Sequence, residues 1–278
     1  MRLRRLTLGA LLLLAAAAAR GETLFYQPQS RDARWSAAQW QAIWRASRAA
    51  GVERLIVQWS RHGDEDFGGA AGWLRASLAQ AADAGLQLVV GLHHDPDYFR
   101  RSADAAGLDV YWQRLLAESA RQHARLRDWQ LPVAGWYLPA ELDDRTFADP
   151  ARRARLSARL GAFAAHLERP LHLSAFSAGQ LTPAAYAAWL DGLRQAGLQP
   201  WWQDGAGTAA LPAGARAAYR DALPCAVGVI HEAFRQTSAA GQPFRAEPRE
   251  PAADSGCHPR AVFSLRYRPW ARLLDTPP

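Results

Sequence analysis

The sequence contains no lysine and no asparagine, and it has only two cysteines. All 33 basic residues are therefore arginine, set against 26 acidic residues, for a formal charge of +7. Because codons for lysine and asparagine are rich in A and T, a GC-rich genome accounts for both absences without a functional bias. A hydrophobic content of 49% with 12 tryptophans excludes a disordered chain, and 278 residues suit one large domain or two small ones.

The chain also lacks an apolar run long enough to cross a membrane. The run at residues 6–19 is shorter than the roughly 20 apolar residues that a span needs. Arginines precede this run and small residues end it, which predicts a secretory signal peptide over residues 1–20 and one domain over residues 21–278. We expect a periplasmic or secreted protein with no stable membrane span after cleavage. Cleavage leaves a formal charge of roughly +3 to +4, so no nucleic-acid partner is expected.

Short apolar runs alternate with helical segments along the rest of the chain. We expect strands over residues 23–27, 54–60, 86–92, 133–138, 171–176, 198–203, 226–231 and 261–267. Helices are expected over residues 36–47, 72–84, 109–129, 150–167, 183–196 and 212–222, the first of them opened by a capping box at Ser36 and Gln39. Eight largely apolar strands alternating with helices predict the α/β class and a single (β/α)8 TIM barrel. The rival is a doubly wound open sheet, whose glycine-rich turn after the first strand is missing here.

One unit of the predicted barrel is irregular. Residues 235–258 are rich in proline, glycine and charge, and they predict a long loop in place of the helix after strand seven. Cys225 lies seven residues before Glu232 at the end of strand seven, and Cys257 lies seven residues before Ser264 of strand eight. In an oxidising compartment this placement predicts a disulfide across the irregular unit, and two buried free thiols are the alternative.

Two glutamates stand out among the residues at the predicted strand ends. Glu141 follows strand four and Glu232 follows strand seven. Active sites of (β/α)8 barrels lie at the carboxyl ends of the strands, and hydrolysis of a glycosidic bond needs one carboxylic acid and one carboxylate. We therefore predict that Glu141 and Glu232 are the catalytic pair. The alternatives are a solvated loop charge for Glu141 and an ion pair with Arg266 or Arg268 for Glu232.

Further polar and aromatic side chains at the strand ends are candidates for contact with a substrate. They are Gln27, Gln58, Trp59, His93, His94, Trp136, Tyr137, Trp202, Asp204, Arg266 and Tyr267. Aromatic rings stack on the flat C–H faces of sugars, although several of the tryptophans can equally be core residues.

Other kinds of chemistry have weaker support. His93, His94 and Asp95 suggest a metal-dependent hydrolase or deacetylase, but adjacent histidines on a strand point to opposite faces and no HExxH pair accompanies them. The GxSxG elbow of a serine hydrolase is missing too. We expect no metal and no cofactor.

The strand-end phrases resemble those of a bacterial family of glycosidase-like TIM barrels described as a domain of unknown function. The phrases are FYQPQ at 25–29, LIVQWS at 55–60, GWYLPAELDD at 135–144, QDGAG at 203–207 and HEAF at 231–234. The resemblance implies the barrel, export and carbohydrate hydrolysis. The layout is also similar to that of retaining glycosidases whose two glutamates follow strands four and seven. Those enzymes usually carry asparagine directly before the acid/base, where this chain has Ala140.

Taken together, these features favour an exported glycoside hydrolase with a two-glutamate retaining mechanism, Glu141 acting as acid/base and Glu232 as nucleophile. Its expected partner is a poly- or oligosaccharide, with an exopolysaccharide as one candidate. A non-catalytic carbohydrate-binding TIM barrel is the alternative, and Ala140 is the residue that favours it.

Overall fold

The computed structural model describes residues 21–239, 242–253 and 256–274. The predicted signal peptide lies outside these residues. Within them, eight parallel strands form a closed barrel in the order β1-β12-β9-β8-β7-β6-β4-β2. The prediction of a TIM barrel is therefore confirmed.

The elements follow one another in the expected alternation. The barrel strands are β1 (Glu22–Tyr26), β2 (Val52–Val57), β4 (Gln87–Gly91), β6 (Val133–Asp143), β7 (Leu171–Phe176), β8 (Leu198–Gln203), β9 (Gly228–Glu232) and β12 (Arg260–Phe263). The helices are α1 (Ala37–Ala49), α2 (Trp73–Asp83), α3 (Tyr98–Ser102), α4 (Leu108–Arg127), α5 (Pro150–Ala164), α6 (Pro183–Gln195) and α7 (Ala213–Ala222). Short 3-10 helices are η1 (Ser30–Arg34), η2 (Gly69–Ala71), η3 (Leu265–Tyr267) and η4 (Pro269–Leu274). None of the described helices is both long and apolar enough to cross a membrane.

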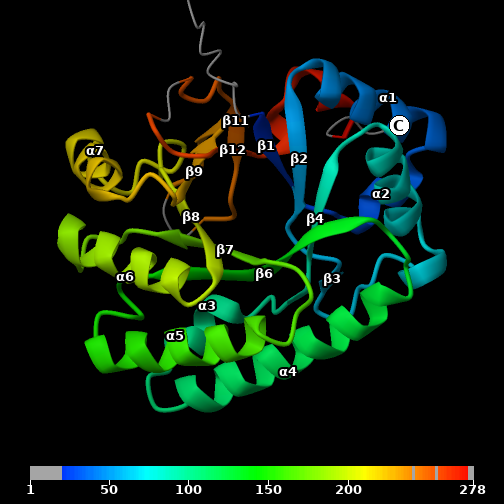
Figure 1. Ribbon diagram of the computed structural model, residues 1–278. Coiled ribbons are helices and arrows are strands. Elements are labelled where there is room, and N and C mark those ends of the chain that lie inside the picture. Colours follow the sequence, from blue (N-terminus) through cyan, green and yellow to red (C-terminus); the bar gives the residue numbers. More distant parts are fainter. Residues whose placement is uncertain (1–20, 240–241, 254–255, 275–278) are drawn as a thin grey trace, which may run out of the picture.

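The α-helices cover the outside of the barrel (Figure 1). Helices α4, α5 and α6 lie along β6 and β7, while α1 and α2 lie beside β2 and β4 (Figure 1). The helix-facing side chains of the strands pack with the helices into one large apolar cluster, which includes Leu24, Leu55, Leu138 and Leu173. The alternate side chains point into the barrel and form a second cluster around Tyr137 and the other interior residues Phe25, Ile56, Val89, Trp201, Ile230 and Ala261. The interior is therefore filled with side chains, and open space is confined to the barrel ends.

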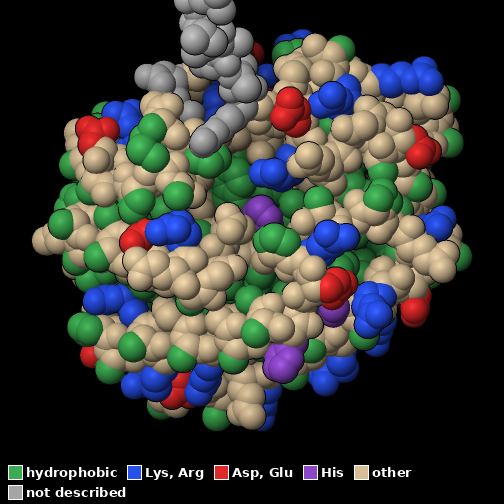
Figure 2. Space-filling view, viewed as in Figure 1, with side chains coloured by type: hydrophobic (Ala, Val, Ile, Leu, Met, Phe, Trp, Pro, Cys, Tyr) green, Lys and Arg blue, Asp and Glu red, His purple; other side chains and the backbone are tan. Residues whose placement is uncertain are grey.

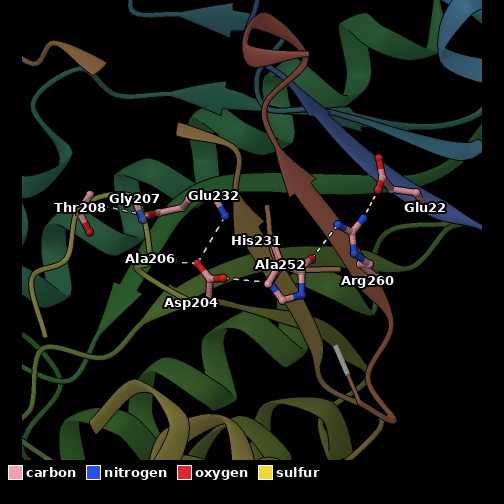
Figure 3. Close-up of polar contacts among 9 residues, drawn as sticks. All are labelled: Glu22, Asp204, Ala206, Gly207, Thr208, His231, Glu232, Ala252 and Arg260. Carbon is pink, nitrogen blue, oxygen red and sulfur yellow. Dashed lines mark hydrogen bonds and ion pairs between the residues drawn. The ribbon is translucent and has the colours of Figure 1, made fainter. Parts of the chain in front are cut away.

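The seam of the barrel joins the two ends of the chain. β1 pairs with β12 on one side and with β2 on the other. Arg260 of β12 forms an ion pair with Glu22 of β1 (Figure 3). Cys225 and Cys257 form the expected disulfide, with 5.2 Å between their Cα atoms, and they precede β9 and β12 by three residues each. This bond lies at the amino ends of the strands, in the unit where no helix covers the barrel.

The irregular unit contains a hairpin as well as a loop. β10 (Phe234–Gln236) and β11 (Ala246–Pro248) pair in antiparallel fashion, and no helix occurs in the described part of the segment between β9 and β12. The prediction that a helix is missing here is borne out, but the short strands were not expected. Without an apolar period of either kind, nothing in residues 235–258 signals a strand pair.

Two predicted strands end four or more residues from the expected position. β6 extends to Asp143, beyond the predicted end at residue 138. The strand predicted over residues 261–267 was too long, since β12 ends at Phe263 and η3 takes its last residues. This turn places Arg266 against the buried carboxylate of Asp32, so the chain leaves the barrel at the point where that ion pair forms.

Candidate active site

Glu141 and Glu232 come from strands three positions apart in the ring of eight. Their side chains line the same hollow at the carboxyl end of the barrel, together with Gln203 from β8. Both glutamates belong to the inward-facing rows of side chains. Glu141 lies four residues beyond the interior residue Tyr137, and Glu232 lies two residues beyond the interior residue Ile230. The barrel therefore brings together two carboxyl groups that are 91 residues apart in the sequence.

An irregularity in β6 sets the height of Glu141. Leu138 pairs with Leu173 of β7, but the next pair along the strands joins Glu141 to Ser174. Two residues, Pro139 and Ala140, are thus accommodated as a bulge. Without the bulge Glu141 would stand two residues further out along the barrel axis, beyond the level of Ser174. Bulges of this kind re-aim side chains beside active sites.

The carboxylate of Glu232 is held by the loop that follows β8. Its Oε2 accepts the backbone N–H of Gly207 at 2.6 Å and that of Thr208 at 3.0 Å (Figure 3). A Cβ on Gly207 would lie 2.4 Å from the carbonyl oxygen of Phe234 and 2.9 Å from Oε2 of Glu232. Only glycine leaves room for the loop backbone to approach the carboxylate this closely.

Asp204 connects this loop to β9. Its Oδ1 accepts the N–H of Ala206 at 3.0 Å and makes a long contact of 3.4 Å with the N–H of Glu232, while its Oδ2 bonds to Nδ1 of His231 at 2.9 Å (Figure 3). Asp204 therefore anchors both the turn that supplies the amides and the residue that receives them. The backbone geometry around Glu232 depends on it.

The pKa values of both glutamates are raised. Burial is the main cause at Glu141, opposed by a hydrogen bond from the side chain of Gln203 that lowers the pKa. At Glu232, burial raises the pKa to about 7. The amides of Thr208 and Gly207 counteract this rise, and the charges of Asp204 and Glu141 add to it. Ionisation of Glu141 therefore makes ionisation of Glu232 less favourable.

Two hollows meet at the glutamates. The smaller, about 260 Å³, is lined by Phe99, Phe176, Ser177, Leu211 and Arg216. The larger, about 1060 Å³, opens toward β1, the β10–β11 hairpin and the segment after β12. Both hollows include Glu141, Gln203, Thr208 and Glu232 in their walls. A molecule that spans both hollows would pass directly over the two carboxyl groups.

Four of the predicted substrate-binding residues line these hollows. Gln27, Arg266 and Tyr267 belong to the wall of the larger one, and Asp204 to that of the smaller. Arg266 is buried and paired with Asp32, and it also donates to the backbone carbonyl of Gln27 at 3.2 Å. Its position is therefore determined by the protein. Glu232 does not form the ion pair with Arg266 or Arg268 that was considered as its alternative role.

The tryptophans predicted at the open face lie elsewhere. Trp136 and Trp202 point out of the barrel into the helix-facing cluster, where the ring of Trp136 packs edge-on against His123 of α4 at 4.7 Å. Both side chains are almost fully buried. Their placement does not agree with contact to a substrate. Side chains alternate along a strand, so Trp136 and Trp202 face away from the barrel interior to which their neighbours Tyr137 and Trp201 point.

Other predicted contacts do not line the two hollows. Tyr137 points into the barrel but is fully buried, and its hydroxyl group forms a hydrogen bond of 2.7 Å with Ser174. Trp59 stacks on His94 with 4.8 Å between ring centroids, and its indole N–H donates to the carbonyl of Pro28. Gln58 is buried beyond β2 and lines neither hollow.

His93, His94 and Asp95 do not converge on a common point. His93 and Asp95 line a separate cavity of about 710 Å³ between α3 and α4, whereas His94 lies in the stack with Trp59. Asp95 is paired with Arg101 at 2.9 Å. Among the described residues no three histidine, cysteine or acidic side chains are grouped as metal ligands. The arrangement thus offers no support for a metal centre on these three residues.

Several residues of the hollow were not singled out from the sequence. Gln203 and Thr208 line both hollows, and Gly207 donates its N–H to Glu232. Phe176 lines the smaller hollow and Phe263 the larger. The QDGAG phrase contained the signal for two of them, since glycines directly after a strand mark a close backbone approach. The role of Thr208 depends on its backbone N–H, which no side-chain pattern could reveal.

A family model described as "Domain of unknown function (DUF4434)" matches residues 22–254. The chain belongs to this family. It is 34% identical over 272 residues to "Uncharacterized protein YbcH" from Escherichia coli (strain K12), an alignment that covers 89% of this chain and 90% of that protein. The family and this relative carry no assigned activity in their names.

The fold also has a counterpart among solved structures. A crystal structure from Bacteroides thetaiotaomicron VPI-5482, named as a "putative alpha-L-fucosidase", superposes with a TM-score of 0.55. It shares 14% sequence identity, and the match covers 97% of this chain and 99% of the other. At that identity the likeness concerns the fold of the barrel.

Proposed function

We propose that this protein is an exported glycoside hydrolase in which Glu141 and Glu232 form the catalytic pair. The observation that supports it best is the placement of two carboxyl groups with raised pKa values in the wall of one hollow at the carboxyl end of the barrel. Cleavage of a glycosidic bond needs one carboxyl group that is protonated and one that is ionised on either side of the anomeric centre. Two carboxyl groups in one hollow, both with pKa values raised by burial, supply the groups for these two roles.

The surroundings of the two glutamates suggest their roles. Oε2 of Glu232 is held by two backbone amides, which fixes the orientation of the carboxylate and stabilises its ionised form. This suits a nucleophile that must attack the anomeric carbon from a set direction. Burial raises the pKa of Glu141, and no backbone N–H group is among the causes that lower it. This suits a general acid. The retaining mechanism belongs to this proposal.

Two further observations support the assignment. The structural neighbour whose name contains "putative alpha-L-fucosidase" has the same barrel, although the likeness concerns the fold alone. The disulfide between Cys225 and Cys257 is consistent with an oxidising compartment such as the periplasm or the exterior, where such bonds form and persist. Export itself is tested by the mass of the protein in the periplasmic fraction, which should correspond to cleavage near residue 20.

The experiment compares Glu141→Gln and Glu232→Gln with the wild type on a panel of 4-nitrophenyl glycosides, α-L-fucoside included, and on polysaccharides assayed for new reducing ends. Both variants should lose about 10²- to 10⁴-fold in kcat while keeping the unfolding midpoint of the wild type. Glu53→Gln is the matched control, because Glu53 is exposed on β2 near the opposite end of the barrel. Full activity in both active-site variants rules the proposal out, and ¹H NMR of the first product anomer decides between retention and inversion.

A non-catalytic carbohydrate-binding barrel is the second candidate, favoured by Ala140. This residue is buried within β6, directly before Glu141, and it offers no amide to a sugar hydroxyl group. Calorimetric binding of a glycan that the wild type does not hydrolyse, with Glu141→Gln and Glu232→Gln binding it equally well, would establish this function instead.

A further inference from the structure

The larger hollow has an unusual balance of charge. Four arginines line it, Arg31 from η1, Arg245 from the segment before β11, Arg266 from η3 and Arg272 from η4. Apart from Glu141 and Glu232 themselves, no acidic residue occurs in the described part of its lining. Because both of those glutamates have raised pKa values, they carry less than two full negative charges near neutral pH. Arginine side chains therefore outnumber acidic side chains in the described part of this lining.

Arginine is common on the whole surface, so the local environment matters more than the count. On the face shown in Figure 2 arginine side chains are spread widely over the surface. Many of them have an acidic partner close in sequence, such as Arg100 with Asp97, Arg121 with Glu118 and Arg194 with Asp191. In the larger hollow, four arginines from segments far apart in the sequence line one space, and one of them, Arg266, is paired with Asp32.

Arg245 is the arginine of this hollow whose guanidinium group is best placed to contact a ligand. Its side chain is exposed, and no hydrogen bond or ion pair of its guanidinium group occurs among the described residues, although its backbone N–H donates to Ser238. Arg266, by contrast, is buried against Asp32, which also accepts from the hydroxyl group of Tyr26. Arg266 thus maintains the structure of the wall, while Arg245 presents its charge to whatever enters.

Aromatic rings lie beside Arg245. Phe244 is 56% exposed, the largest exposed fraction of any big apolar side chain described here together with Phe99. Its ring packs edge-on against Phe234 at 5.5 Å, and Phe234 lies 5.1 Å from the ring of Tyr267. All three rings belong to the wall of the hollow. Aromatic surface next to an unpaired guanidinium group matches a sugar ring that bears an anionic substituent.

We infer that the larger hollow binds an anionic saccharide, with its carboxylate or sulfate group at Arg245 and its sugar rings on Phe244, Phe234 and Tyr267. This inference rests on the proposed function, since it identifies the substrate class of the same site. Guanidinium groups recognise carboxylate and sulfate oxygens through paired N–H donors, so the two substituents share one chemistry. The sugar that reacts would lie over Glu141 and Glu232, and the anionic sugars on the side of the hairpin.

The test is affinity electrophoresis of the full mature chain in gels containing polygalacturonate, dextran sulfate or neutral dextran. The Glu141→Gln/Glu232→Gln double variant is run beside the wild type, so that turnover does not consume the probe. We expect retardation by at least one of the two anionic polymers and none by dextran, and polygalacturonate against dextran sulfate separates a carboxylate site from a sulfate site. Arg245→Gln should weaken anionic binding about tenfold, as loss of a charge-assisted contact predicts.

A matched control separates a specific site from the general attraction of a cationic protein. Arg194→Gln removes the same charge from an exposed arginine on α6 and should leave retardation unchanged. Equal weakening by Arg194→Gln and Arg245→Gln, or equal retardation by dextran, overturns the inference. Hydrolysis of neutral glycans alone would overturn it while leaving the proposed function intact. Arg245-dependent binding of an anionic polymer without any hydrolysis would support the anionic site and count against the hydrolase.

Discussion

Glu232 and Gly207 are in direct contact across the loop after β8, with the N–H of Gly207 donating to Oε2 of Glu232 at 2.6 Å. The contact exists because Gly207 has no side chain. A Cβ at this position would come within 3 Å of both the carbonyl oxygen of Phe234 and the carboxylate of Glu232. This backbone amide, together with that of Thr208, therefore helps to orient the proposed nucleophile and lowers its pKa.

Gly207→Ala should displace the loop and weaken both amide bonds to Glu232. Because those bonds lower the pKa of Glu232, we expect its pKa to rise above about 7 in the variant. The free energy of unfolding should fall by about 1–3 kcal/mol, as is usual when atoms are added to a filled site. Carboxyl ¹³C NMR titration, with the Glu232 resonance assigned from Glu232→Gln, measures the first effect, and urea unfolding measures the second.

Gly192→Ala is the control for this change. Gly192 lies inside α6, and a Cβ there meets nothing within 4 Å. Alanine at this position should raise stability by up to about 1 kcal/mol and leave the titration of Glu232 unchanged. An unaltered pKa of Glu232 in Gly207→Ala would show that the amides do not govern it.

Asp204→Asn should lower the pKa of Glu232. The charge of Asp204 is one of the factors that raise this pKa, whereas asparagine retains an oxygen that can accept the N–H groups of Ala206 and Glu232. The same NMR titration measures the shift. Asp191→Asn, on the exposed face of α6, removes an equal charge far from the loop and should have no effect. A rise in the pKa of Glu232 in Asp204→Asn would contradict the electrostatic explanation.

The stabilising contribution of Glu232 should decrease as the pH rises through neutrality. Folding raises the pKa of Glu232 from 4.5 to about 7, so between these values the folded state binds more protons than the unfolded state. The contribution of Glu232 to the free energy of unfolding then falls with pH across this window, by roughly 3 kcal/mol in total for a shift of this size. Glu141, whose pKa is also raised by burial, contributes in the same direction. Histidines act in the opposite direction, because burial lowers the pKa of His94 to about 4 and that of His172 to about 3.

Urea unfolding of the wild type and of Glu232→Gln at pH 5 and at pH 8 isolates this contribution, because the histidines are present in both proteins. Between pH 5 and pH 8 the wild type should lose more stability, or gain less, than Glu232→Gln, while Asp191→Asn should behave like the wild type because the pKa of Asp191 is lowered by its bond to Arg194 and lies below this range. The same change of stability with pH in the wild type and in Glu232→Gln would refute the raised pKa of Glu232.

Removal of the disulfide should affect stability and spare the active site. Cys225 and Cys257 lie at the amino ends of β9 and β12, and Glu232 lies at the carboxyl end of β9. The Cys225→Ser/Cys257→Ser variant should therefore lose about 2–4 kcal/mol of unfolding free energy, the usual effect of a bond that closes a loop of this length. Hydrolysis by the folded fraction should be unchanged. A disulfide-free protein as stable as the wild type would mean that packing alone holds the unit without a helix.

The sequence by itself determined the architecture and the identity of the central pair. Alternating apolar strands and helices leave few packings besides a closed barrel, and the carboxyl ends of its strands must converge. The sequence therefore predicts the positions of Glu141, Glu232, Asp204 and the two cysteines at the ends of the strands. The capping box at Ser36 and the missing seventh helix followed from local chemistry in the same way.

Only the tertiary structure decided which face each side chain occupies and how the backbone completes the site. Trp136 and Trp202 were expected at the open face, but the pleat turns them toward the helices, because a shift of one residue along a strand reverses the side. The bulge before Glu141 and the two amides at Glu232 are properties of the backbone, on which residue type places little constraint. The arginines of the larger hollow come from segments more than 200 residues apart, and they line one space only when the barrel closes.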